Sequence, residues 1–133
     1  MRVFILVLVL LFTIPACRTN PFSETPEFLE SQVKTFEGVV RWGALEKMYL
    51  FLKPDPDNPI KVQPGLDNVR VTGYEIGNPL TRLEDGRWVQ TVVIDYVLQD
   101  RQVVRQIVDY QVWVSDDEDR KKWYRENSLP QFR

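Results

Sequence analysis

Two acidic–aromatic dipeptides, Asp95-Tyr96 and Asp109-Tyr110, are the residues of this 133-residue chain whose types suit acid–base chemistry. Burial raises the pKa of a carboxyl group, so a carboxylate in a cavity can act as a general base near neutral pH. The chain contains no histidine, the usual proton shuttle and the commonest metal ligand. The four residues are therefore the candidates for catalysis, and we expect no metal and no cofactor.

Two long strands carry these dipeptides. Strands are expected over Trp88–Leu98 and over Gln102–Val114, and Asp100-Arg101 between them forms a tight turn. The resulting antiparallel hairpin places Val92 opposite Asp109. Because neighbouring strand residues point to opposite faces of a sheet, each dipeptide is split between the two faces.

On one face of this hairpin, Asp95 lies with Tyr110. On the other, Tyr96 and Asp109 flank Arg105, and we favour structural cross-strand pairing over catalysis as the interpretation of these residues. Both faces are largely apolar, and a sheet of this kind needs cover on both sides. We expect helices on one face and a loop, a ligand or the second subunit of a homodimer on the other.

The first part of the chain has the pattern of a helix. Thr25 or Ser23 is suited to cap it, Pro26 is suited to its first position, and apolar residues recur with a period of 3.6 over residues 28–40. Gly43 then interrupts the pattern. A helix that ends at this glycine is therefore expected.

A second, shorter helix is expected over Ala44–Leu52, followed by a proline-rich connector over Lys53–Asn68. The period then changes to two, with a bulge at Gly73. We expect turns and one last strand at the following segments: turns at Gly77-Asn78-Pro79 and Glu84-Asp85-Gly86, and a strand at Trp123-Tyr124. Helices followed by an antiparallel meander indicate an α+β fold.

Arg41 and Trp42, at the end of the first helix, are candidate pocket residues together with Trp88 and Trp113. If Arg41 faces the sheet, its guanidinium would seek one of the two strand aspartates. The tryptophans would then line a site for a small apolar ligand. Packing in the core is the interpretation that we favour for them, as is usual for large aromatic side chains.

The N-terminal segment has the layout of an export signal. Arg2 precedes the apolar stretch Val3–Ile14, and Pro15-Ala16 follows directly before Cys17, the single cysteine of the chain. The apolar stretch is shorter than the roughly 20 residues that a membrane-spanning helix needs. We therefore expect residues 1–16 to be a cleaved signal peptide.

The end of this segment resembles the lipobox of bacterial lipoproteins, with aliphatic Ile14 and small Ala16 before Cys17. The resemblance implies diacylglycerol on the cysteine sulfur, cleavage before Cys17 and acylation of its new amino group, which anchors the chain to a lipid bilayer. Residues 17–26 would then form a tether. Arg18 in place of aspartate implies the outer membrane, facing the periplasm, by the sorting rule of Gram-negative lipoproteins.

Residues 27–132 resemble small NTF2-like (cystatin-like, SnoaL-type) lipoproteins of unknown function. The resemblance rests on Val39-Val40-Arg41-Trp42-Gly43 at the end of a helix, the strand Val69–Tyr74, the two long strands, and a closing Trp-Tyr followed by Leu-Pro. It implies that residues 27–133 form a conical α+β domain whose sheet wraps around a long helix, with a cavity between them. It implies no single activity, because this fold serves enzymes and binding proteins alike.

Two functions are compatible with these observations. The favoured one is a non-catalytic, membrane-tethered module that binds an envelope protein or a small apolar ligand. The alternative is a cofactor-free lyase, isomerase or hydrolase that uses Asp95 or Asp109. A net charge of −2 makes nucleic acid an implausible partner. An unpaired carboxylate in an open cavity would favour catalysis, whereas a closed or arginine-neutralised cavity would favour binding.

Overall fold

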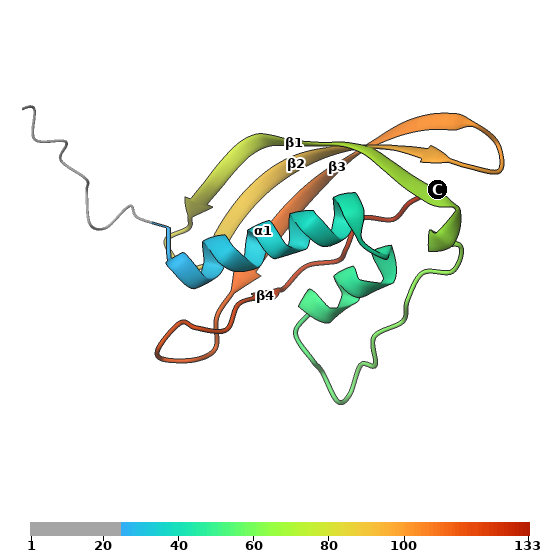
Figure 1. The fold of residues 1–133 in the computed structure, drawn as a ribbon. Helices are drawn as coiled ribbons and strands as arrows, with labels where there is room; N and C mark the ends of the chain where they lie inside the picture. Colours follow the sequence, from blue (N-terminus) through green and yellow to red (C-terminus); the bar gives the residue numbers. More distant parts are fainter. Residues whose placement is uncertain (1–24) are drawn as a thin grey trace, which may run out of the picture.

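A long helix lies against a curved antiparallel sheet (Figure 1) in the computed structural model, which describes residues 25–133. The expected signal peptide, Cys17 and the tether up to residue 24 lie outside the described residues. None of the helices in the described part of the chain has the length and apolar character needed to cross a membrane.

Helix α1 spans Glu27–Trp42 and turns one apolar stripe toward the sheet. The buried side chains of this stripe recur every three or four residues, the spacing that places side chains on one helix face. They are Leu29, Val33, Phe36 and Val40. Acidic residues in the first turn and a basic residue in the last turn suit the helix dipole. The predicted first helix is therefore confirmed.

The start of α1 differs from the expectation. Pro26 occupies the capping position, and no side chain caps the helix there, so the predicted cap at Thr25 is wrong. Ser23, the other predicted cap, lies outside the described residues. The Pro26 carbonyl accepts a hydrogen bond from the Glu30 N–H at 2.9 Å, and a proline in this place sacrifices no donor that the helix would use.

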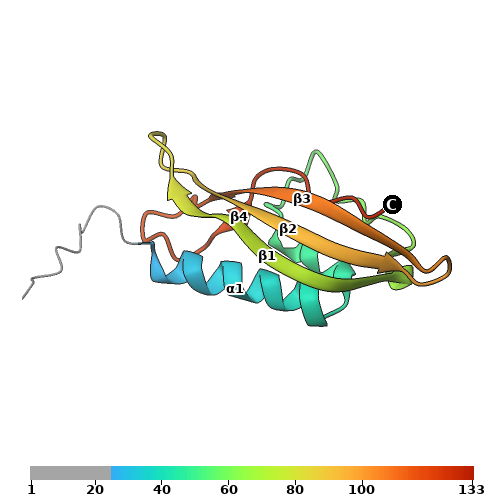
Figure 2. The same ribbon diagram turned by 90° about the horizontal axis from the view of Figure 1, so that it is seen from above.

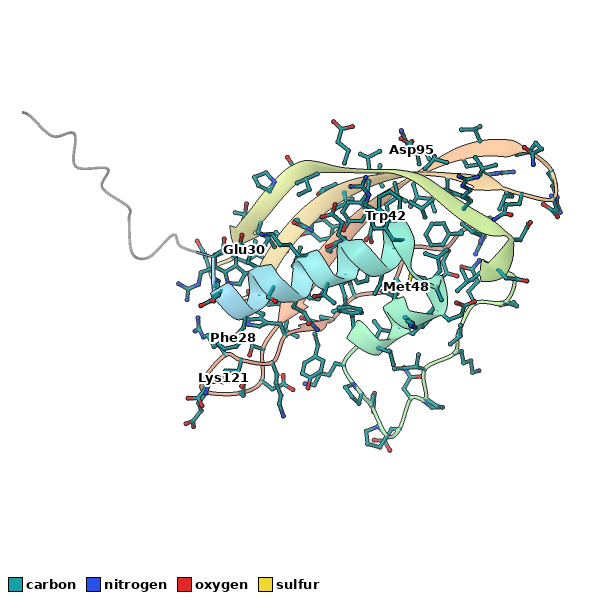
Figure 3. The ribbon with its side chains drawn as sticks, in the orientation of Figure 1. Phe28, Glu30, Trp42, Met48, Asp95 and Lys121 are labelled. Atoms are coloured by element: carbon teal, nitrogen blue, oxygen red, sulfur yellow. The ribbon has the colours of Figure 1, made fainter. Side chains whose placement is uncertain are left out.

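The expected second helix is a 3₁₀ helix, η1, over Leu45–Phe51. Residues 53–65 contain no helix or strand, as the prolines predict, and a short 3₁₀ turn, η2, follows at Leu66–Asn68. Met48 of η1 is fully buried, so η1 closes one end of the core beside α1 (Figure 3).

Four antiparallel strands form the sheet in the order β1-β2-β3-β4. They are β1 (Val69–Arg82), β2 (Trp88–Leu98), β3 (Val103–Val114) and β4 (Tyr124–Arg125). Each residue of β2 pairs with β3 in the register that the sequence predicts, including Val92 opposite Asp109. The α+β class and the long hairpin are thus confirmed, and the last strand is present one residue later than the expected Trp123-Tyr124.

Strand β1 is longer than expected. Its register against β2 shifts at three places, and the shift between Val71 and Gly73 is the predicted bulge. The predicted turn at Gly77-Asn78-Pro79 is wrong, because two further shifts absorb these residues and the strand continues to Arg82. The predicted turn at Glu84-Asp85-Gly86 is confirmed, and Gly86 adopts a φ of 86° that favours glycine.

The two faces of the sheet differ in cover, as the view from above shows (Figure 2). We call the face toward α1 the inner face and the opposite one the outer face. The inner face of β2 is buried along its whole length, at Trp88, Gln90, Val92, Ile94, Tyr96 and Leu98. Aromatic rings from three elements fill the centre, and the Phe36 ring lies 5.1 Å from that of Phe51 and 5.6 Å from that of Trp113 in edge-to-face contacts.

Candidate functional site: a closed inner face and an open outer face

Asp109, one of the two candidate bases, lies buried on the inner face of β3 and is paired with Arg125. Arg125 Nη2 lies 2.9 Å from Asp109 Oδ1, and Nη1 lies 3.1 Å from Oδ2. Gln111 Nε2 donates a further hydrogen bond to Oδ2 at 2.9 Å. Both carboxylate oxygens are therefore occupied, and the negative charge of Asp109 is neutralised by a two-armed contact.

Further polar groups extend this cluster under the helix. Gln111 Nε2 also donates to the Tyr74 hydroxyl at 3.0 Å, and Gln111 Oε1 accepts from Gln90 Nε2 at 2.9 Å and from Trp113 Nε1 at 3.2 Å. Burial raises the pKa of Tyr74 well above its usual value, so its hydroxyl stays protonated at neutral pH. We call these residues, together with Asp109 and Arg125, the polar core.

The charge of Arg125 is satisfied on every side. Its Nη2 also donates to the Ser128 carbonyl at 3.0 Å, and its Nε donates to Asn127 Oδ1 at 3.2 Å. The guanidinium carbon lies 5.2 Å from the centre of the Phe36 ring and 6.0 Å from that of Trp113, within the range of cation–π attraction. The region between helix and sheet thus holds a satisfied ion pair where a catalytic site would need a reactive carboxylate.

Asp95, the other candidate base, lies on the outer face of β2. Its Oδ1 accepts a hydrogen bond from Gln106 Nε2 at 2.8 Å, and its Oδ2 approaches the bulge glycine so closely that a Cβ at Gly73 would lie 2.9 Å from it. Glycine at this position therefore leaves room for the carboxylate.

The two tyrosines of the dipeptides are separated as the strand geometry predicts. Tyr110 is exposed on the outer face. Tyr96 is buried on the inner face, where its hydroxyl donates to the Arg133 carbonyl at 2.8 Å and accepts from the Arg133 N–H at 3.1 Å. Asp95, Tyr96, Asp109 and Tyr110 do not converge on one site, and the structure uses Tyr96 to hold the C-terminal segment against the sheet.

The four candidate pocket residues also separate. Trp88 and Trp113 are buried in the core, whereas Trp42 is 79% exposed at the C-terminal end of α1 (Figure 3). Arg41 pairs with Glu37 at 3.2 Å and lies 5.0 Å above the Trp42 ring, so it does not reach either strand aspartate. With Arg70, Arg41 and Trp42 line a shallow hollow of about 280 Å³ beside β1.

A larger hollow of about 720 Å³ lies between the proline-rich connector and the segment that follows β4. Its lining mixes charges of both signs with proline and isoleucine, including Lys53, Asp55, Ile60, Lys61 and Glu126. Lys53 is already paired with Asp116 at 3.1 Å. The hollow is open, and among the described residues that line it there is no buried unpaired carboxylate.

The outer face exposes large apolar side chains. Along β3, Val104 is 74% exposed, Val108 is 64% exposed and Tyr110 is 51% exposed. The outward residues of β2 beside them are half-buried, and they are Val89, Thr91, Val93, Asp95 and Val97. Nothing within residues 25–133 packs over this strip, although large exposed apolar side chains side by side are typical of a contact surface.

Sequence reasoning missed Arg125, which lies in a two-residue strand with no periodic pattern. The sequence suggested Arg41 or Arg105 as the basic partner of the strand aspartates, and the structure assigns that role to Arg125. No local signal distinguishes this arginine, because its contact with Asp109 depends on the return of the chain to β3 after an acidic loop.

Comparisons of the chain with family models, curated proteins and solved structures found no match.

Proposed function

We propose that this protein is a lipid-anchored protein of the bacterial cell envelope and that its domain is a non-catalytic binding module of the NTF2-like type. The observation that carries the proposal is the contrast between the two faces of the sheet. The inner face is closed and its carboxylate is paired with Arg125, whereas the outer face exposes Val104, Val108 and Tyr110. Binding rather than chemistry is the role that this arrangement supports.

The outer face suits a protein partner better than a small apolar ligand. A small ligand gains affinity from a concave site that surrounds most of its surface. The outer face is instead an extended strip of exposed apolar side chains that includes a tyrosine, a residue type enriched in protein contact surfaces. An envelope protein is therefore the proposed partner.

The catalytic alternative, a cofactor-free lyase, isomerase or hydrolase, needs a carboxylate that can accept a proton inside a cavity. Asp109 is occupied by Arg125 and Gln111, and Asp95 lies on the opposite side of the sheet. Neither placement favours this alternative.

The anchor is proposed from the sequence. A lipobox-like segment before Cys17 and a tether that reaches at most about 30 Å would hold the domain close to a bilayer. Acyl chains contribute on the order of 0.8 kcal/mol per buried CH₂, so two or three chains make the attachment effectively permanent. Arg18 after the cysteine favours the outer membrane.

Two experiments test these parts separately. Metabolic labelling with an acyl-chain analogue should label the wild-type protein and leave Cys17→Ser unlabelled, and equal labelling of both would overturn the anchor.

Crosslinking and co-purification of the intact protein from membranes should recover a partner that is lost in Val93→Asp/Tyr110→Asp. The control Thr72→Asp adds a charge at an exposed site of β1 and should keep the partner. Recovery of the same partner by the doubly substituted protein would exclude the outer face.

A further inference from the structure

Strands β1 and β3 lie at opposite margins of the sheet (Figure 2), and the edge of β3 that β4 does not pair is less protected than the edge of β1. Proteins protect sheet edges by bulges, prolines or cover, because unpaired backbone groups invite another strand. Strand β1 has three register shifts and contains Pro79. Strand β3 runs without a shift over its whole length and pairs with β4 only at Trp113 and Val114.

The hydrogen bonds near β4 reveal which backbone groups of β3 point to this edge. The Val112 carbonyl accepts from the Glu126 N–H, and the Val112 N–H donates to Asn127 Oδ1, both at 2.9 Å. Asn127 Nδ2 also donates to the Tyr110 carbonyl. Because backbone direction alternates along a strand, the N–H and C=O groups of Val108 and of every second residue before it point to the same edge.

Three residues therefore present free backbone groups, namely Val104, Gln106 and Val108. Within residues 25–133, no backbone or side-chain partner occupies their outward N–H and C=O groups. The stretch is limited at one end by Asn127, which binds the Tyr110 carbonyl and the Val112 N–H. At the other end, Gln102 leaves the strand with a φ of 53°.

We propose that this edge pairs with the same edge of a second copy of the chain, antiparallel and centred on Gln106. Gln106 then faces Gln106 of the second copy, and Val104 of each copy faces Val108 of the other. The three residue pairs form six hydrogen bonds, which satisfy all the outward groups of this stretch. Moving the centre to Ile107 would place Val104 against Tyr110, whose carbonyl is already occupied.

Side chains and charges agree with this register. Val104 against Val108 is a pair of β-branched side chains on the outer face, which stabilises cross-strand contacts. Arg105, the single charged residue between Val103 and Val108, faces Ile107 of the second copy rather than another arginine. In this register the hairpin turn at Gln102 of one copy comes next to Tyr110 and the Asn127 cap of the other.

The seam is short. A standard interface involves about 20 or more residues on each side, and this one pairs about five. We therefore expect a dimer that dissociates on dilution and is favoured where chains are concentrated, as on a membrane. The pairing uses the edge of the sheet and does not require the outer face to bind a partner, so either proposal can fail alone.

Single cysteines in the full-length protein test the register in membranes. Gln106→Cys places two thiols on a directly opposed pair with Cα atoms about 5.5 Å apart, within the range of a disulfide. Val104→Cys places its two thiols four residues out of register, about 14 Å apart. Mild oxidation should give a reducible dimer with Gln106→Cys. With Val104→Cys, the amount of dimer should not exceed that formed by the parent chain. The parent chain is the control for any disulfide made by Cys17.

Co-expression of Val104→Cys with Val108→Cys should restore the crosslink, because these positions face each other. Equal crosslinking by Val104→Cys alone, or none by Gln106→Cys in a folded protein, would overturn the proposed register. Sedimentation of the detergent-solubilised protein gives an independent measurement. The pair Val104→Lys/Val108→Lys should abolish the dimer, and Val104→Lys/Val108→Glu should retain it, whereas equal loss in both would also contradict the pairing.

Discussion

Arg125 and Asp109 form a fully enclosed ion pair with two nearly parallel contacts of 2.9 and 3.1 Å. The pair joins the short strand β4 to the inner face of β3, so it closes the domain at the place where a cavity carboxylate would otherwise be free. The same contact explains why the C-terminal segment returns across the core. It therefore links the stability of the domain to the pairing of the Asp109 carboxylate.

Arg125→Met leaves the Asp109 carboxylate buried without its counter-charge. We expect the free energy of unfolding to fall by about 3–5 kcal/mol, as is typical for removal of one partner of a buried pair. Urea unfolding measures it. The matched control is Arg41→Met, which removes an exposed pair with Glu37 and should cost at most about 1 kcal/mol. Similar losses in the two variants would contradict the structural role of Arg125.

Tyr74 should make the free energy of unfolding decrease at alkaline pH. Burial raises the pKa of its hydroxyl above the ordinary value of 10.0, whereas the unfolded chain has the ordinary value. The stabilisation is therefore complete below about pH 10 and is lost as the pH rises above it, because the unfolded state then releases the proton more readily. Urea unfolding between about pH 8 and pH 12 should show this decline.

Tyr74→Phe should reduce the alkaline decline while losing the hydrogen bond from Gln111, so its stability at neutral pH should be lower. Tyr110→Phe removes a hydroxyl from an exposed tyrosine and is the matched control. If the free energy of unfolding of Tyr74→Phe falls at alkaline pH as much as that of the wild-type protein, a group other than Tyr74 causes the decline.

Gly38, inside α1, and Gly43, directly after it, should respond to alanine in opposite ways. A Cβ at Gly38 meets nothing within 4 Å, and alanine is preferred inside a helix, so Gly38→Ala should stabilise the domain by about 0.5–1 kcal/mol. A Cβ at Gly43 would lie 2.9 Å from the Val39 carbonyl oxygen, so Gly43→Ala should destabilise it. Thermal unfolding of the two variants checks both signs, and the same sign in both would contradict the described end of the helix.

Asp117 organises the acidic loop before β4, residues 115–119. Its carboxylate accepts from the Ser115 hydroxyl at 2.7 Å and from the Lys121 and Lys122 N–H groups at 3.0 and 3.3 Å, and the Ser115 contact is the largest cause of its lowered pKa. These bonds are present above the ordinary pKa of an aspartate and are lost as the pH falls.

Asp117→Ala should therefore speed hydrogen exchange at the Lys121 and Lys122 amides, with little change in the core strands. In the wild-type protein, the protection of these two amides should decrease under acid. Asp119→Ala, in the same loop but without these bonds, is the control. Unchanged exchange in Asp117→Ala would show that the loop is held by other contacts.

Local pattern was enough to predict much of the fold. The hairpin of β2 and β3 has the predicted register because the tight turn at Asp100-Arg101 sets which residues face each other. The bulge at Gly73 was predicted from a break in the period of two along β1, and α1 was predicted from its apolar stripe. The turn expected at Gly77-Asn78-Pro79 failed, because pairing with β2 outweighed the preference of these residues for a turn.

The sequence by itself determined the order of the elements, the split of each Asp-Tyr dipeptide between two faces, and the expectation of an exported, lipid-anchored chain, which stays a prediction. Only the tertiary structure decided which face α1 covers, which arginine neutralises Asp109, and which edge of the sheet is left open. The physical reason is the range of the contacts. Register and helical stripes arise between residues near in sequence, whereas the Asp109–Arg125 pair and the free edge of β3 depend on where the chain returns after its loops.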